Sequence, residues 1–168
     1  MKKIIVLLAS VFMLQACDDG DITLESFNFD TVTVQNCTTN NLVYKINRNE
    51  QLLLSIPETN FPNEVTVVGS PRIVNVNAEN RIVYRLYSDN VTSTTICSVL
   101  PPASPVVQKE WNATGGTIEI ITNAIYAADG ITITSYTHNI KFKNVNFSNP
   151  DNSFSFTEYI FGNYVTVL

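Results

Sequence analysis

Hydrophobic positions in most of the chain recur in short runs instead of at helical spacing. Between residues 22 and 168, short β-branched and aromatic runs alternate with clusters of Asn, Asp, Gly and Pro, about every 8–12 residues. We find no convincing 3.6-residue apolar period. This pattern predicts an all-β fold, an antiparallel β-sandwich that is Ig-like or jelly-roll-like. We expect a single domain, residues 31–168, after a short flexible tether.

The expected strands are the alternating segments between turn signals. They cover residues 22–35, 42–46, 52–56, 64–68, 72–77, 81–87, 91–100, 106–111, 117–126, 131–147, 154–161 and 163–168. Within 131–147 the apolar residues switch from odd-numbered to even-numbered positions and back again. Because side chains alternate between the two faces of a strand, this switch predicts bulges or a bend near 134–136 and 143–144. Residues 112–116 are expected to turn. The uncharged segment 164–168 would be an aggregation-prone edge if open, so we expect it to be paired in a sheet.

The first sixteen residues have a different character. Met1-Lys2-Lys3 is basic, and residues 4–14 are apolar except for one serine. As a helix this apolar stretch would be about 16 Å long, too short for a hydrocarbon core of about 30 Å. The pattern is typical of a secretory signal peptide, residues 1–16, which is removed from the mature chain.

A cysteine directly follows this segment, in the sequence Leu14-Gln15-Ala16-Cys17. The motif resembles the lipobox of bacterial lipoproteins. The resemblance implies a diacylglycerol on the sulfur of Cys17, cleavage before Cys17 and acylation of the new amino terminus, which together give stable membrane anchoring. The alternative is an ordinary signal peptide after which Cys17 pairs with another cysteine.

An acidic run follows at Asp18, Asp19 and Asp21. It resembles the export signal of surface lipoproteins in Bacteroidota-type bacteria, and in style the chain resembles uncharacterised flavobacterial lipoproteins. The resemblance implies a lipid-anchored outer-membrane protein exposed at the cell surface, with residues 17–30 as an acidic tether running into the first strand. The alternatives are inner-membrane retention through Asp18, a periplasm-facing lipoprotein, or a plain solvated tether. Thr31 lies in a short motif that resembles a Bacteroidota-type O-glycosylation acceptor.

Charge and cysteine usage narrow the possible partners. Loss of Lys2 and Lys3 with the signal would change the net charge from −5 to −7, and no basic patch remains, which argues against nucleic acid. Cys37 and Cys97 are an even pair in an oxidising compartment and predict a disulfide; two buried free thiols are the alternative.

The chain offers few groups for catalysis. His138 is the only histidine, so a multi-histidine metal site is impossible, and we expect no metal and no cofactor. No phosphate-binding loop or nucleophile elbow occurs. Glu110, Glu119 and Glu158 remain as a possible glycosidase-like carboxylate pair, although solvated acids on strand faces are the simpler interpretation.

Aromatic residues in the strands could form a stacking platform for sugar rings. Trp111 is the best candidate, with Tyr84 and Tyr87 beside it; core packing would use the same residues. We therefore expect a membrane-anchored, non-enzymatic binding or accessory domain for a glycan or protein. The alternatives are an envelope structural or adhesion protein and a small carboxylate-based hydrolase.

Overall fold

In the described part of the chain, eight antiparallel strands form one curled sheet, joined by loops and two short helical segments. The structure, a computed structural model, describes residues 27–40 and 42–168. The predictions for the signal peptide, Cys17, Asp18, Asp19 and Asp21 fall on residues 1–26 and lie outside the described residues.

The strands become longer toward the carboxyl end of the chain. They are β1 (Gln35–Asn36), β2 (Leu42–Asn47), β3 (Glu50–Ser55), β4 (Arg72–Asn75), β5 (Arg81–Tyr87), β6 (Val107–Tyr126), β7 (Ile133–Ser148) and β8 (Ser153–Val167). A 3-10 turn η2 (Glu58–Asn60) follows β3, and helix α2 (Ser93–Cys97) follows β5. The strand order is β1-β2-β3-β5-β6-β7-β8, and β4 pairs with β6 beyond the end of β5. The all-β antiparallel prediction is confirmed.

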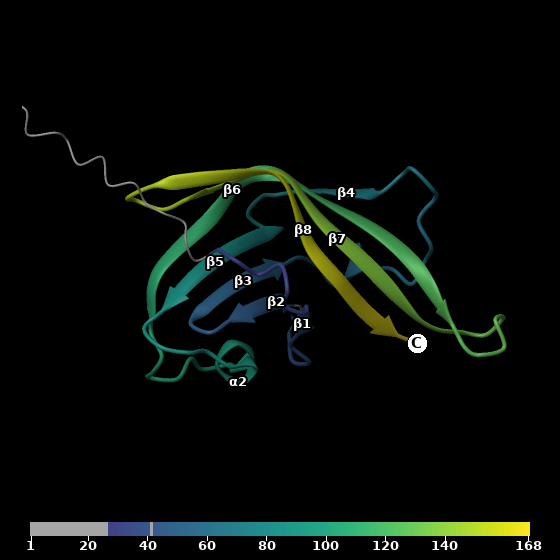
Figure 1. Ribbon diagram of the computed structural model, residues 1–168, viewed down its shortest axis with the longest axis horizontal. Helices are drawn as coiled ribbons and strands as arrows, with labels where there is room; N and C mark the ends of the chain where they lie inside the picture. Colours follow the sequence, from purple (N-terminus) through teal and green to yellow (C-terminus); the bar gives the residue numbers. More distant parts are fainter. Residues whose placement is uncertain (1–26, 41) are drawn as a thin grey trace, which may run out of the picture.

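The three long strands bend, so that one sheet covers both sides of its own core. In Figure 1, β6, β7 and β8 arch over β2, β3 and β5. The first half of β6 pairs with β5, and the second half pairs with β4. The halves therefore face each other as in a sandwich, but they are parts of one continuous sheet, and a sandwich of two separate sheets is not confirmed.

Irregular backbone at the middle of each long strand produces the bend. The register between β6 and β7 shifts on both sides of Gly115, and Asn144 and Gly162 have φ values of 50° and 122° in β7 and β8. The turn expected at residues 112–116 is therefore wrong, because Gly115 and Gly116 bend a continuous strand instead of ending it. The bend expected near residues 143–144 is confirmed at Asn144.

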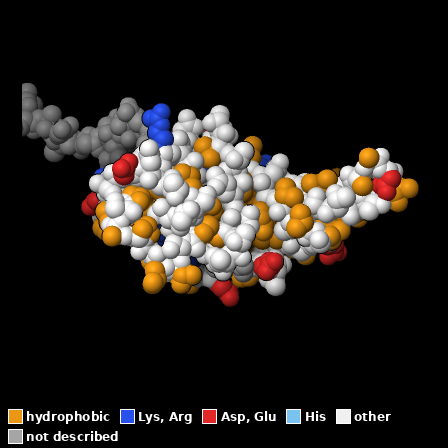
Figure 2. Space-filling view, turned by 90° about the horizontal axis from the view of Figure 1, so that it is seen from below, with side chains coloured by type: hydrophobic (Ala, Val, Ile, Leu, Met, Phe, Trp, Pro, Cys, Tyr) orange, Lys and Arg blue, Asp and Glu red, His pale blue; other side chains and the backbone are white. Residues whose placement is uncertain are grey.

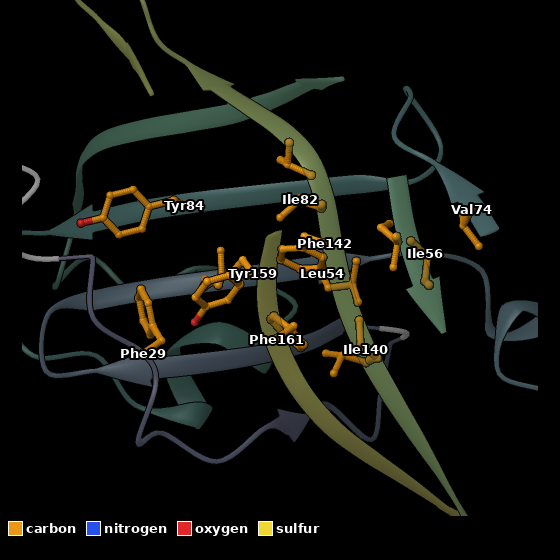
Figure 3. Close-up of a cluster of buried hydrophobic side chains, with 14 of the residues drawn as sticks. Phe29, Leu54, Ile56, Val74, Ile82, Tyr84, Ile140, Phe142, Tyr159 and Phe161 are labelled. Atoms are coloured by element: carbon orange, nitrogen blue, oxygen red, sulfur yellow. The ribbon is translucent and has the colours of Figure 1, made fainter. Parts of the chain in front are cut away.

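The concave side of the curled sheet holds the hydrophobic core. Figure 3 shows side chains from both halves meeting there, among them Leu54, Ile140, Phe142 and Phe161, each at most 1% exposed. Burying one such side chain stabilises the fold by about 1.5–3 kcal/mol relative to its exposure. The core therefore holds the two halves of the bent sheet together.

The segment before β1 also packs into the core. Phe29 is fully buried, and the ring of Phe27 contacts both Phe154 and Phe156. The buried ammonium of Lys45 donates a 2.7 Å hydrogen bond to the carbonyl oxygen of Phe29. Residues 27–29, which the sequence places in the tether, are thus attached to the body of the domain.

The predicted disulfide between Cys37 and Cys97 is present. Residues 91–100 were expected to form a strand, but residues 93–97 form α2 instead, because Thr92 caps its first turn by accepting from the backbone N–H of Thr95. Cys97 and Ile96 pack on the convex face of the sheet against Cys37 and its buried neighbours. A crosslink between residues 60 apart stabilises the fold by about 4 kcal/mol on the chain-entropy model.

The bend makes a testable prediction about its two glycines. Gly116 has a φ of 109°, and a Cβ there would lie 2.7 Å from the carbonyl oxygen of Asn144, whereas a Cβ at Gly115 would meet nothing within 4 Å. We expect Gly116→Ala to lower the free energy of unfolding by about 2–4 kcal/mol, from backbone strain and overpacking. Gly115→Ala, the matched control, should change it by less than about 1 kcal/mol. Urea unfolding measures both, and equal effects of the two substitutions would contradict this account of the bend.

Candidate functional site

A groove of about 390 Å³ lies where the curled sheet stays open. β1 and β8 are the two terminal strands of the sheet order, and the groove has walls from both sides of this opening. Its lining residues are Asn36, Cys37, Thr38, Thr39, Asn40, Leu42, Val43, Glu58, Phe61 and Tyr164. We call it the β1–β8 groove.

One wall of the groove is the polar loop between β1 and β2. The loop is closed by a 3.0 Å hydrogen bond from the backbone N–H of Cys37 to the carbonyl oxygen of Leu42. The side-chain oxygen of Asn40 accepts from the N–H of Leu42, and the hydroxyl of Thr39 donates to the carbonyl oxygen of Cys97. Because Cys37 is also fixed by the disulfide, this wall presents amide and hydroxyl groups from a braced loop.

The floor of the groove is apolar and aromatic. Phe61 follows η2 and meets the ring of Tyr164 edge-on, with 5.0 Å between the ring centroids. Burial, together with the nearby carboxylate of Glu58, raises the pKa of Tyr164 above its usual value. The Tyr164 hydroxyl therefore stays protonated at neutral pH and can donate a hydrogen bond.

A buried histidine supports this floor from behind. His138 is fully buried in β7, with ring centroids 5.3 Å from Phe61 and 5.9 Å from Tyr164. Its Nδ1 lies 2.9 Å from the hydroxyl of Thr122, and its Nε2 lies 3.0 Å from the hydroxyl of Thr166. His138 thus connects three strands of the sheet beneath the groove.

The hydrogen-bond partners of the two ring nitrogens determine the tautomer of His138. The Thr166 hydroxyl donates to the side-chain oxygen of Asn63 at 2.7 Å, so it accepts from Nε2–H of His138. The Thr122 hydroxyl then donates to the unprotonated Nδ1. Burial, with a smaller effect of the Arg72 charge, lowers the pKa of His138 to about 4. The neutral imidazole has both nitrogens satisfied, as a structural residue requires.

The predicted aromatic platform is not formed by the expected residues. Trp111, Tyr84 and Tyr87 are only 6%, 1% and 5% exposed. Trp111 stacks on Tyr84, its register partner, and donates from Nε1 to Asn152, while the Tyr87 hydroxyl donates to Gln51. The polar tips of Trp111 and Tyr87 find internal partners, and all three rings pack inside instead of offering a face to a sugar.

The candidate catalytic carboxylates are held by bases on the surface of the sheet. Glu110 accepts from Arg85 at 2.7 Å. Glu158 pairs with Lys141, at 3.1 Å, and with Lys143. Glu119 lies opposite Lys141 in the ladder between β6 and β7. These carboxylates therefore lie on strand faces beside basic side chains, and the contacts bring no two of them together as a catalytic pair.

Thr31 is exposed, at a turn next to Asp30. Within residues 27–40 and 42–168, no three or more His, Cys, Asp or Glu side chains gather as a metal site would require. In the same ranges, no helix has the length and apolar character needed to cross a membrane.

Comparisons with protein-family models, with curated proteins and with solved structures gave no match to this chain. The site must therefore be interpreted from its own residues. The sequence did contain one signal for it: the run Asn36-Cys37-Thr38-Thr39-Asn40 is dense in amides and hydroxyls beside a predicted disulfide.

The buried histidine predicts a pH dependence of stability. In the unfolded chain its pKa is near 6.5, and in the fold it is about 4, so the unfolded state binds more protons between these values. Stability is therefore complete above about pH 6.5 and should fall by about 2–3 kcal/mol as the pH is lowered to 4. Urea unfolding from pH 7 to pH 4 measures this. His138→Gln should be less stable at pH 7 but should lose less on acidification; an unchanged pH profile would contradict the assignment.

Proposed function

We propose that this protein is a non-catalytic binding domain that takes a polar ligand, foremost a glycan, in the β1–β8 groove. The observation that supports this is the composition of the groove, with amides and hydroxyls on one wall, aromatic rings on the floor and a carboxylate at the side. Pockets for small ligands commonly combine an apolar floor with a few convergent polar groups.

The chemistry of the wall favours a polyhydroxylated ligand. Amide side chains such as those of Asn36 and Asn40 both donate and accept hydrogen bonds, as do the hydroxyls of Thr38 and Tyr164. Sugar hydroxyls need both functions at once, and the apolar face of a pyranose ring suits contact with the half-buried ring of Tyr164. The volume of about 390 Å³ is at the small end of ligand pockets, which fits one or two sugar rings better than a long chain.

The braced loop adds pre-organisation to the proposed site. The disulfide at Cys37 fixes the polar wall before a ligand arrives, and the His138 network fixes the floor. A rigid site loses less conformational entropy on binding, which favours affinity for a weakly binding ligand class. A protein ligand with a polar extended segment would use the same groups and is the second candidate.

The proposed location follows from the amino-terminal residues. Lipid on Cys17 and export directed by Asp18, Asp19 and Asp21 would hold the domain on the outer membrane, at the cell surface. There a binding domain would meet extracellular glycans or partner proteins. A periplasm-facing anchor is the alternative location.

Blocking the groove tests the binding proposal. Thr38 is exposed on the groove wall, whereas Thr157 is exposed on β8 away from it. The secreted domain lacking the lipid anchor should bind a subset of glycans on an array. Thr38→Arg should lower that affinity at least about tenfold, which is about 1.4 kcal/mol, because the long side chain fills the groove. Thr157→Arg, the matched control, should bind as wild type.

Two outcomes would count against the proposal. Equal glycan binding by the two arginine variants would remove the β1–β8 groove as the site. Failure of the wild-type domain to retain any glycan, with capture of a peptide or protein that Thr38→Arg abolishes, would assign the groove to the second candidate.

Lipid attachment has its own test. Cys17→Ala removes the sulfur that would carry the diacylglycerol, so incorporation of labelled palmitate into the protein should drop to background, as should lipoprotein-type cleavage. Cys37 and Cys97 form a disulfide and offer no competing thiol. Labelling of Cys17→Ala at the wild-type level would show that the lipobox interpretation is wrong.

A further inference from the structure

The far ends of the long strands project beyond the core as an arm. We define the arm as residues 121–139, the β6–β7 hairpin and its turn, together with residues 160–168 at the end of β8. Figure 1 shows these strands running outward past β2 and β3, and Figure 2 shows hydrophobic side chains scattered along the projection to its tip. Exposed members include Ile121, Ile125, Tyr126, Ile131, Val165 and Val167, of which Ile131 is 82% and Val167 78% exposed.

The arm carries almost no charge. Asp129 is its only Asp, Glu, Lys or Arg residue, and the one histidine, His138, is buried and neutral. The carboxylate of Asp129 accepts hydrogen bonds from the backbone N–H groups of Ile131 and Thr132, both at 2.9 Å, and from the Thr132 hydroxyl at 2.6 Å. This one charge therefore closes the turn. Exposed apolar surface with so little charge marks an interaction surface in soluble domains.

The arm also offers a free backbone edge. β8 is the terminal strand of the sheet, and among the described residues it pairs only with β7. Residues 160–168 contain no proline and no charged side chain, although natural edge strands commonly use both to prevent pairing. The sequence predicts that segment 164–168 is paired; the structure pairs one edge of it and leaves the other open.

We propose that the arm is a self-association surface, on which the open edge of β8 pairs antiparallel with β8 of a second copy of this chain. The near absence of charge on the arm favours an uncharged partner surface, and a second arm provides one. A charged partner surface would lose its hydration against this arm and gain no opposite charge, which is unfavourable. A second arm has the same near absence of charge, so pairing two arms removes no exposed charge from water.

Geometry agrees with a two-fold pair. Two identical strands that pair antiparallel are related by a two-fold axis, the commonest symmetry of soluble dimers. The arm extends away from the charged body, so two arms can meet while the bodies remain apart (Figure 1). Centring the pair on Thr166 sets Val165 of each copy opposite Val167 of the other. Directly opposed β-branched side chains stabilise antiparallel strands.

Sedimentation of residues 18–168, which lack both the apolar segment 4–14 and the thiol of Cys17, tests the proposal. At tens of micromolar we expect a dimer. Val165→Lys with Val167→Lys places like charges across the two-fold and should weaken the dimer at least about tenfold. Val99→Lys with Leu100→Lys adds the same charge at exposed positions on the body and should leave the dimer unchanged.

Either of two results would overturn the proposal. One is that residues 18–168, without further substitution, stay monomeric at every concentration up to about 1 mM. The Kd of the dimer would then lie above about 1 mM, which is too weak for a specific association. The other is a dimer that both lysine pairs weaken equally or not at all.

Cysteine crosslinking tests the register independently of dimer strength. In residues 18–168, Val165→Cys mixed with Val167→Cys should form a reducible dimer several-fold faster than either variant alone. Val99→Cys provides the background rate. Crosslinking of the mixed pair at that background rate would contradict the β8 pairing. Neither experiment depends on ligand binding in the groove, so their failure leaves the proposed function standing.

Discussion

The close approach of backbone at the bend is the constraint on which the fold depends. At Gly116 the β6 backbone comes so near Asn144 and Lys143 of β7 that no side chain fits between them. This contact lets three long strands turn through the middle of the sheet without losing their neighbours. A sheet of this size left flat would expose one apolar face to water. By bending, it buries that face against itself and needs neither a second sheet nor a covering helix.

A sheet that curls without closing leaves two terminal strands, and these account for the two surfaces to which we assign functions. Where β1 approaches β8 across the opening, side chains from both ends form the groove. Where β8 runs past the body, nothing in the described chain covers its outer edge. The groove and the arm therefore follow from one topological feature. A closed barrel would have neither, because its first and last strands would satisfy each other.

Local sequence patterns predicted what depends on neighbouring residues. The run of β-branched residues in 117–126 predicted a strand, and the even cysteine pair predicted the disulfide. The same local logic misread Gly115 and Gly116, because glycines that end a strand and glycines that bend one look alike in sequence. Residues 91–100 have β-branched side chains, yet the Thr92 cap and the Cys97 crosslink favour α2 there. The groove joins Asn36 to Tyr164 across most of the chain, and no local pattern reports such a contact.

The positions of the chain entry and the arm connect the two proposals. Phe27, the first described residue, packs against Phe154 and Phe156, just after the turn that joins β7 to β8. The arm lies at the opposite ends of those same two strands. A lipid anchor attached through residues before Phe27 would therefore hold the domain by one end of its longest strands and direct the arm away from the membrane. Pairing through the arm would then link copies at their outer ends, at a distance from the lipid surface.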